Sequence, residues 1–297
     1  MGQIRAWSRD CVASREIRRC GIQHDSYLRR KWVFLSRFRR SSASTRSAAV
    51  SIHDVSARQG QLIAVSATYV KSRGVLPAAV LLILDFGGNL RSAVALDPSR
   101  EIISLAIDDR LNIWSLAWHS GDKNPGAVPL VTEYSKQGEV LRELFKRTDF
   151  PPHEDSIQQG PNIGSVQAGC GAGVFWFWLP KSTDFVEINT TTGAVMNKTK
   201  TQSPQVSGQT ACILKLVRES SGAIVVEAAV ENTRPNDTKD RSLRHYMWSP
   251  ETKSWTAYDP ASTCPDYRLI GVDGDKHLYM RFKPGSMRGS ICSYIRR

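Results

Sequence analysis

Two short clusters in the sequence combine imidazole and carboxylate groups. His153, Glu154 and Asp155 are consecutive in a proline-bounded loop, and His119 precedes Asp122 by three positions. Imidazole and carboxylate side chains together can hold a metal ion or transfer protons. Adjacent residues rarely converge on one ion, however, and polar loop residues are usually solvated. We therefore treat both clusters as candidates for ligand binding, and we expect neither a metal nor a cofactor.

Acidic residues also mark two turns between apolar runs. Asp108 and Asp109 form one of these turns, and Asp273-Gly274-Asp275 forms the other. The second turn lacks the spacing and the distant glutamate of a calcium loop. Asp-Gly between apolar runs is a strong hairpin signal, so we expect a turn there. No Gly-x-Ser-x-Gly, His-Glu-x-x-His or Walker sequence appears in the chain.

The most apolar stretch of the chain is Phe175-Trp176-Phe177-Trp178. In a β-strand, alternation places the two phenylalanines on one face and the two tryptophans on the other. Aromatic residues on both faces suit a strand packed between two layers. A platform on which a carbohydrate or another ligand stacks is the alternative.

The elements that must position these residues are short strands. Apolar runs separated by Gly, Asn, Asp and Pro fill the chain from Val50 onward and predict antiparallel β-structure. They group into four units of four strands and a last unit of three. The predicted strands are 50–56, 61–69, 80–86 and 89–96; 102–107, 111–118, 129–134 and 139–145; 163–168, 174–179, 184–188 and 194–198; 211–217, 223–231, 243–248 and 254–258; 267–272, 277–282 and 290–295. In the third unit, Gly169, Gly171 and Gly173 are expected to form the first turn.

These units resemble one another. The third-to-fourth strand turns align as Tyr134-Ser135-Lys136-Gln137-Gly138, Ile188-Asn189-Thr190-Thr191-Thr192-Gly193 and Trp248-Ser249-Pro250-Glu251-Thr252-Lys253. A four-stranded repeat of about 40–50 residues is the period of a propeller blade. The sequence therefore predicts an all-β fold, a β-propeller of four-stranded antiparallel blades with about five blades recognisable. A β-sandwich, which would show similar strands without self-similarity, is the alternative.

A family resemblance accompanies the repeat. Residues 103–144, with AIDDRLNIWSL followed by LVTEYSKQGEVLREL, resemble a blade of the bacterial NHL-like and TolB-like six-bladed propellers, and residues 166–200 and 211–260 follow the pattern less closely. This chain offers four full units and one partial unit, so it is incomplete or divergent relative to that family. The resemblance implies a superfamily and no particular activity. Catalytic propellers place metal-binding carboxylates around the central channel, and no such set can be matched here. The resembled family is often extracytoplasmic.

The positive charge of the protein is concentrated at its N-terminus. The chain carries a net charge of +12, and residues 1–50 supply +9 of it, with eleven arginines and Lys31 against Asp10, Glu16 and Asp25. We expect residues 1–48 to be a basic, flexible tail and residues 49–297 to form the propeller. Nucleic acid is expected to bind only non-specifically, through residues 1–48. No apolar run reaches transmembrane length, and no signal peptide is recognised.

The six cysteines are widely separated and include no Cys-x-x-Cys pair. This spacing argues against a zinc site or a redox motif. The even count permits disulfides without requiring them. We expect Cys170 and Cys212 to be small buried side chains.

The last unit lacks a fourth strand, and residues 31–38 are the unassigned segment that alternates like one. We expect this segment to close the ring by pairing with the last unit, which would give five blades where the resembled family has six. The function predicted from the whole sequence is a non-catalytic binding scaffold for a protein or an extracellular ligand. The alternative is a hydrolase or lyase of the six-bladed propeller type that acts at the central channel.

Overall fold

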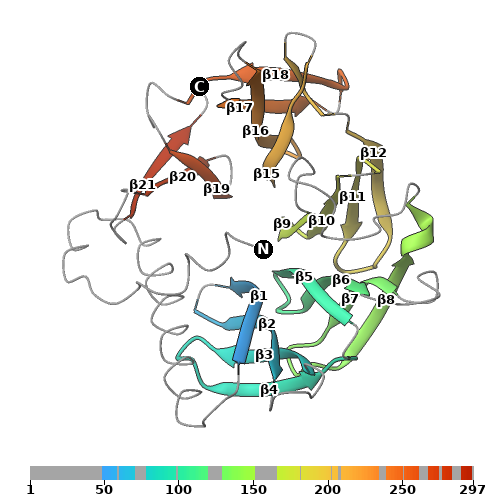
Figure 1. The fold of residues 1–297 in the computed structure, drawn as a ribbon. Helices are drawn as coiled ribbons and strands as arrows, with labels where there is room; N and C mark the ends of the chain where they lie inside the picture. Colours follow the sequence, from blue (N-terminus) through green and yellow to red (C-terminus); the bar gives the residue numbers. More distant parts are fainter. Residues whose placement is uncertain are drawn as a thin grey trace.

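The computed structural model describes residues 49–295, apart from short gaps at 59, 71–77, 98–99, 120–128, 151–165, 181, 202, 207–208, 234–238, 250, 261–266, 274–275 and 283–288. The expected tail, residues 1–48, and its predicted closing strand 31–38 lie outside the described residues. Figure 1 shows small sheets arranged around a common centre, as the sequence predicts. The fold is a β-propeller, and the β-sandwich alternative is wrong.

Four blades have four antiparallel strands, and the fifth has three among the described residues. Blade 1 contains β1 (Ala49–Arg58), β2 (Leu62–Val70), β3 (Ala78–Asp85) and β4 (Leu90–Ala95). Blade 2 contains β5 (Arg100–Ile107), β6 (Ile113–His119), β7 (Pro129–Tyr134) and β8 (Val140–Lys146), followed by the 3-10 turn η3 (Arg147–Asp149). Blade 3 contains β9 (Gln167–Gly171), β10 (Val174–Leu179), β11 (Asp184–Asn189) and β12 (Val195–Lys200).

Blade 4 contains β15 (Cys212–Arg218), β16 (Ile224–Thr233), β17 (Lys239–Ser249) and β18 (Ser254–Tyr258). Blade 5 contains β19 (Arg268–Asp273), β20 (Lys276–Phe282) and β21 (Gly289–Ile295). A two-stranded ribbon, β13 (Gln205–Val206) and β14 (Gln209–Thr210), lies between blades 3 and 4 in the sequence and was not predicted.

The first strand of every blade faces the centre of the ring (Figure 1). These inner strands contact one another in sequence, β1 with β5, β5 with β9, β9 with β15, and β15 with β19. Blades 1 and 5 show no comparable contact among the described strands. The inner strands therefore define a central channel, and β4, β8, β12 and β18 lie at the outer edge.

The hydrophobic core lies between the blades, because each sheet is apolar on both faces. Phe175 and Phe177 of β10 pack toward blade 2, where Trp114 stacks on Phe175 at 4.9 Å between ring centroids. Trp176 and Trp178 of the same strand pack toward blade 4. The alternation predicted for this strand is confirmed, and its aromatic side chains belong to the core, where all four are buried.

One turn geometry recurs at four places on the same face of the ring. In each turn, a first residue accepts a backbone hydrogen bond from the fourth and donates one to the fifth, and the fourth residue has positive φ. This is the loop of a type I turn followed by a left-handed residue. The four turns begin at Asp85, Asp108, Ser135 and Glu219, and their fourth residues are Gly88, Leu111, Gly138 and Gly222. The predicted start of a strand at Leu111 is therefore wrong, because Leu111 has φ of 68° and β6 begins at Ile113.

The first strand of blade 3 also differs from prediction. Gly169 and Gly171 lie within β9 and not in a turn, and the strand occupies 167–171 in place of 163–168. Gly169 pairs with Trp176 across the sheet. A Cβ atom on Gly169 would lie 2.6 Å from the Trp176 ring, so the glycine makes room for the indole. The glycine cluster reflects packing at this position, with the turn confined to Ala172 and Gly173.

Candidate functional site

Of the five ligand residues predicted from the sequence, the structure describes only the backbone of His119. His119 is the last residue of β6 and pairs with Arg100, the first residue of β5. The side chain of His119 lies outside the described part of the chain, as do Asp122, His153, Glu154 and Asp155. The strands that lead into both clusters, β6 and β8, end at one face of blade 2. The structure therefore leaves these candidates untested.

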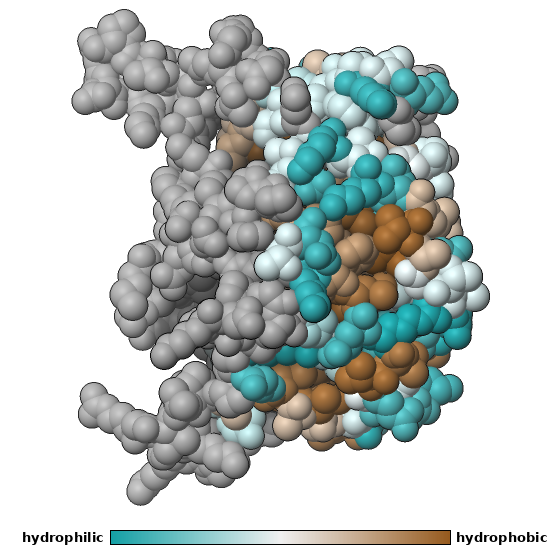
Figure 2. All heavy atoms as spheres, turned by 90° about the vertical axis from the view of Figure 1, so that its right-hand side faces the viewer, coloured by the Kyte–Doolittle hydropathy of each residue, from teal (hydrophilic) through white to brown (hydrophobic). Residues whose placement is uncertain are grey.

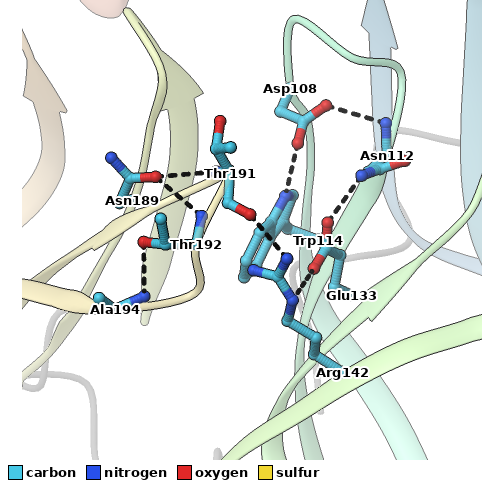
Figure 3. Close-up of polar contacts among 9 residues, drawn as sticks. All are labelled: Asp108, Asn112, Trp114, Glu133, Arg142, Asn189, Thr191, Thr192 and Ala194. Atoms are coloured by element: carbon cyan, nitrogen blue, oxygen red, sulfur yellow. Dashed lines mark hydrogen bonds and ion pairs between the residues drawn. The ribbon is translucent and has the colours of Figure 1, made fainter.

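Asp108 has a structural role in its turn. Its buried carboxylate accepts hydrogen bonds from the backbone N–H groups of Arg110 and Asn112, both at 2.9 Å, and from Trp114 Nε1 at 3.0 Å. Figure 3 shows the bonds from Asn112 and Trp114. Because both carboxylate oxygens already accept donors within blade 2, Asp108 does not serve the channel.

The same network continues outward and joins blade 2 to blade 3 (Figure 3). Asn112 Nδ2 donates to Glu133 Oε1 at 2.7 Å, and Glu133 Oε2 lies 3.3 Å from Arg142 Nε. Arg142 Nη2 then donates to the Thr191 carbonyl in the β11–β12 turn at 2.7 Å. Burial raises the pKa of Glu133, against the opposing effects of Asn112 and Arg142. The network fixes the third-to-fourth strand turn of blade 3 against the outer strand of blade 2.

Polar side chains near the channel hold successive blades together. In three places, a backbone N–H of an inner strand donates to a side chain of the preceding blade, and each of these donating strands contains a register shift. Such bulges interrupt the ladder and leave backbone groups for other partners. The bonds join Leu105 N to Asp54 Oδ2 at 2.7 Å, Leu216 N to Gln167 Oε1 at 2.8 Å, and Leu269 N to Glu227 Oε2 at 2.8 Å.

Glu227 is the most heavily used of these acceptors. Its side chain is 1% exposed, and its Oε1 accepts a hydrogen bond from Arg268 Nε at 2.5 Å. Its Oε2, which already accepts from Leu269, also lies 3.4 Å from His245 Nε2. Burial raises the pKa of Glu227, but His245, the Leu269 amide and Arg268 outweigh it and hold the pKa below the ordinary value. Both oxygens of this carboxylate are therefore engaged.

Lys215 lies directly opposite Glu227 in the β15–β16 register. The lysine is half-buried on an inner strand and interacts electrostatically with Asp54 of blade 1 as well as with Glu227. Burial lowers the pKa of Lys215, and the two carboxylates oppose that effect only in part. No hydrogen bond or ion pair connects its ammonium group to another described residue. Lys215 is thus a charged channel group without a dedicated partner in the described structure.

The interface between blades 4 and 5 is more polar than the others. Glu219, the first residue of its turn, reaches across to His277 of β20, with Oε1 and Nε2 2.6 Å apart and both side chains buried. Tyr258 and Tyr279 share a hydrogen bond at 2.8 Å beside this pair, and burial raises the pKa of both phenols. Asp85, Asp108 and Ser135, at the same turn position, bind their own turns. Glu219 also binds its own turn, because its Oε2 accepts from Ser221 Oγ at 2.9 Å, and its Oε1 in addition holds the last blade.

A second candidate surface lies on the outer edge. The burial patterns of β4, β8 and β12 all begin with two exposed residues. Apolar side chains fill most of these positions, and we call them the apolar rim: Leu90, Val140, Leu141, Val195 and Met196, each 47–59% exposed. Figure 2 shows apolar surface on this flank between hydrophilic bands. Their placement at matching strand starts puts them at one edge of three neighbouring blades.

The rim positions of neighbouring blades are brought near one another because two of the turns pack on the preceding blade. A Cβ atom on Gly138 would lie 2.4 Å from Val94 of β4, and one on Gly193 would lie 2.6 Å from Arg142 of β8. The turns that lead into Val140 and Val195 are therefore pressed against the neighbouring outer strands. The rim ends at blade 4, where β18 begins with Ser254.

A small cavity of about 100 Å³ opens between blades 3 and 4, lined in part by Phe185, Glu187, Arg218 and Trp248. Its charged groups pair with each other, Arg218 Nε with Glu187 Oε1 at 2.5 Å. Within the described residues, no three His, Cys, Asp or Glu side chains are arranged to hold a metal ion. None of the described segments is a helix long and apolar enough to cross a membrane.

Comparisons with known proteins agree with the fold. No protein-family model and no curated protein matches the sequence. Among solved structures, the β-propeller domain of the Trilobed protease from Pyrococcus furiosus has a TM-score of 0.50 at 12% identity, over 82% of this chain and 68% of that one. The likeness shows a β-propeller and nothing finer.

Two further solved structures are more distant. A protein of unknown function from Bacteroides caccae is 13% identical over 78% of this chain and 70% of that chain, with a TM-score of 0.43. The acylaminoacyl peptidase of Pyrococcus horikoshii is 13% identical over 84% of this chain and 38% of that chain, with a TM-score of 0.45. This chain spans well under half of the peptidase. Neither likeness bears on activity.

None of these interacting residues was predicted from the sequence: Lys215, Glu227, Arg268 and the Glu219–His277 pair. A usable signal was present for two of them. Lys215 interrupts the apolar run Ile213–Val217, and Glu227 interrupts Ile224–Ala229. A single charged residue inside the apolar run of a core strand is rare and indicates a specific interaction or function. The other three meet only through contacts between blades 4 and 5, which no local pattern reveals.

Proposed function

We propose that this protein is a non-catalytic β-propeller scaffold that binds a partner protein along the apolar rim. The observation that supports this is the recurrence of large exposed apolar side chains at matching positions of blades 1, 2 and 3. Contiguous apolar surface on a water-soluble fold typically marks an interaction site.

The strands beneath the rim add a second reason. β4, β8 and β12 are edge strands with unpaired backbone groups, which native proteins usually protect with lysine or proline. On β12, Lys198 and Lys200 protect only the far end, and the start carries Val195 and Met196. A partner that covers the rim would protect the exposed end of each edge.

Site-specific photo-crosslinking tests the proposal. A photoreactive amino acid replaces Met196 in one protein and Lys253, an exposed residue of blade 4, in a matched control. In extract of the source cells, we expect a defined adduct from position 196 that is absent from position 253. A second protein that also carries Leu141→Ser should lose the adduct while melting at an unchanged temperature. The same adducts from both positions would overturn the proposal.

The finer expectations from the sequence remain part of this proposal. The resemblance to NHL-like and TolB-like propellers supports a member of that superfamily with five blades in place of six. Cys292 is disulfide-bonded, whereas Cys170 and Cys212 are not. Disulfides persist in oxidising compartments, so this bond supports an extracytoplasmic location and an extracellular partner. Residues 1–48 are proposed to bind nucleic acid only non-specifically.

The alternative function, a hydrolase or lyase at the central channel, has one supporting observation. Lys215 and Glu227 are channel-side groups whose pKa values depart from their ordinary range, as catalytic groups often do. Turnover of a lactone or a polysaccharide that is lost in Lys215→Met would favour it over the scaffold.

A further inference from the structure

Lys215 and Arg268 are two cations beside one carboxylate. Lys215 faces Glu227 across the β15–β16 ladder, where directly opposed side chains lie close together. Arg268, on the inner strand of the next blade, binds the same carboxylate through Nε. β15 and β19 are themselves in contact. The two cations therefore flank the same carboxylate at the boundary between blades 4 and 5.

Neither cation is fully satisfied by the groups around it. The oxygens of Glu227 are engaged by Arg268, by the Leu269 amide and by His245. Asp54, the other carboxylate that acts on Lys215, accepts from Leu105 N at 2.7 Å and from Val55 N at 2.8 Å. Both acids thus have hydrogen-bond donors of their own. The Lys215 ammonium and the two Nη groups of Arg268 make no hydrogen bond within the described structure.

Because the Lys215 ammonium group forms no ion pair within the described residues, it lowers the stability of the fold, which indicates that it binds a ligand. A half-buried ammonium group loses hydration and gains no ion pair in return, so an apolar residue at this position would be more stable. The Arg268 side chain is 46% exposed, which leaves its guanidinium within reach of solvent. An arginine fork and an ammonium group together suit a planar, bidentate oxyanion.

We propose that Lys215 and Arg268 form a binding site for a small organic carboxylate in the central channel. The carboxylate accepts from the Nη groups of Arg268 on one side and from Lys215 Nζ on the other. Glu227 holds the arginine in place and makes no contact with the ligand. The site is independent of the apolar rim, which lies at the opposite, outer edge of the blades.

Competitive labelling of the full-length protein tests this inference, with citrate as the probe. Acetic anhydride, a small neutral reagent, acetylates lysines at rates that peptide mass spectrometry follows residue by residue. Lys200, which is exposed and paired with Asp184 at 2.9 Å, provides the internal reference. Near ten times its dissociation constant, citrate should slow acetylation of Lys215 about tenfold and leave Lys200 unchanged. Sodium chloride of equal ionic strength should protect neither lysine.

Two variants assign the site. Arg268→Gln should lose most of the protection at Lys215, whereas Arg244→Gln, an exposed arginine of blade 4, should keep it. Arg268→Lys keeps a charge beside Glu227 and should retain partial protection, which guards against loss of fold in the glutamine variant. Equal protection of Lys215 by citrate and by sodium chloride in the unaltered protein overturns the proposal. Full protection in a folded Arg268→Gln protein overturns it as well.

Discussion

At the scale of single residues, Gly169 and Asp108 serve local packing and turn structure. Gly169 was expected in a turn, yet it lies in β9 under the Trp176 indole. Asp108, one of the acidic residues that mark turns in the sequence, binds its own turn and the Trp114 ring nitrogen. Lys215, in contrast, lies on an inner strand and forms no ion pair or hydrogen bond through its ammonium group within the described residues.

Two neighbouring glycines give a matched test of this packing. Gly169→Ala should destabilise the protein by about 1–3 kcal/mol, because the new methyl group would lie 2.6 Å from the Trp176 ring. Gly171→Ala should change stability little, since a methyl group there would have no atom within 4 Å and the φ of Gly171 is not positive. Urea denaturation measures both. Equal effects of the two substitutions would contradict the proposed fit between Gly169 and Trp176.

Glu227 links stability to pH. Its folded-state pKa lies below the ordinary value, so the folded protein binds fewer protons in acid than the unfolded chain. Its contribution is therefore complete above the ordinary carboxyl pKa and is lost as the pH falls through the folded value. Glu227→Gln should cost about 1–3 kcal/mol at pH 7, because the hydrogen bonds of the carboxylate to Arg268 and to the Leu269 amide weaken, while the half-exposed Arg268 keeps access to water.

The same substitution should flatten the fall in stability below pH 5, measured by denaturant unfolding at a series of pH values. Glu251→Gln removes an exposed carboxylate and serves as the control, with an unchanged pH curve. An acid limb of unaltered steepness in Glu227→Gln would show that other carboxylates control acid unfolding.

At the scale of elements, β10 is the strand on which two blade interfaces depend. Its phenylalanines complete the core with blade 2, and its tryptophans complete the core with blade 4. The four aromatic side chains therefore hold a neighbouring blade against each face of one sheet. This role removes the ligand-platform interpretation, because the rings are buried.

Trp178→Ala should cost about 3–5 kcal/mol through the cavity it leaves. The indole is 1% exposed, and its Nε1 donates to Thr201 Oγ1 at 3.0 Å. The substitution therefore also leaves that hydroxyl without its donor. Trp255→Ala, which alters a partly buried ring at the edge of the same cluster, should cost clearly less. Thermal unfolding compares them, and a Trp178→Ala protein that melts with the unaltered protein would contradict the interface role.

At the scale of the whole molecule, closure of the ring depends on the junction between blade 5 and blade 1. Blade 5 has three strands among the described residues, and the side of blade 1 that faces away from blade 2 is also apolar. Ile63, Val65 and Leu84 are buried on that side. A closed ring would pack this apolar face of blade 1 against blade 5. It would also add a fourth strand to the three described strands of blade 5.

We predict that residues 31–38 supply the missing strand, since they precede β1 by ten residues and alternate as a strand does. A protein that begins at residue 45 should unfold less cooperatively or aggregate through the exposed edge of β21. A protein that begins at residue 25 is the control and should melt as the full chain does. An unchanged, sharp melt of the shorter protein would show that the ring is stable without this strand.

The blades follow from local sequence patterns. Strand period, turn residues and the repeat are local properties, because a strand and its hairpin partner lie within about 15 residues of each other. Four complete units and a three-stranded fifth were therefore predictable with nearly correct bounds. So was the two-sided burial of Phe175–Trp178, which follows from alternation and from the need of each blade for neighbours.

Which charged residues lie together depends on how the blades pack. Lys215 and Arg268 are 53 positions apart, and Glu219 and His277 are 58 apart. They come together because blade 5 packs on blade 4, and that contact depends on the rotation between sheets and not on any local pattern. The apolar rim has the same origin: each strand start is unremarkable alone, and it becomes a surface when the turns of neighbouring blades pack side by side.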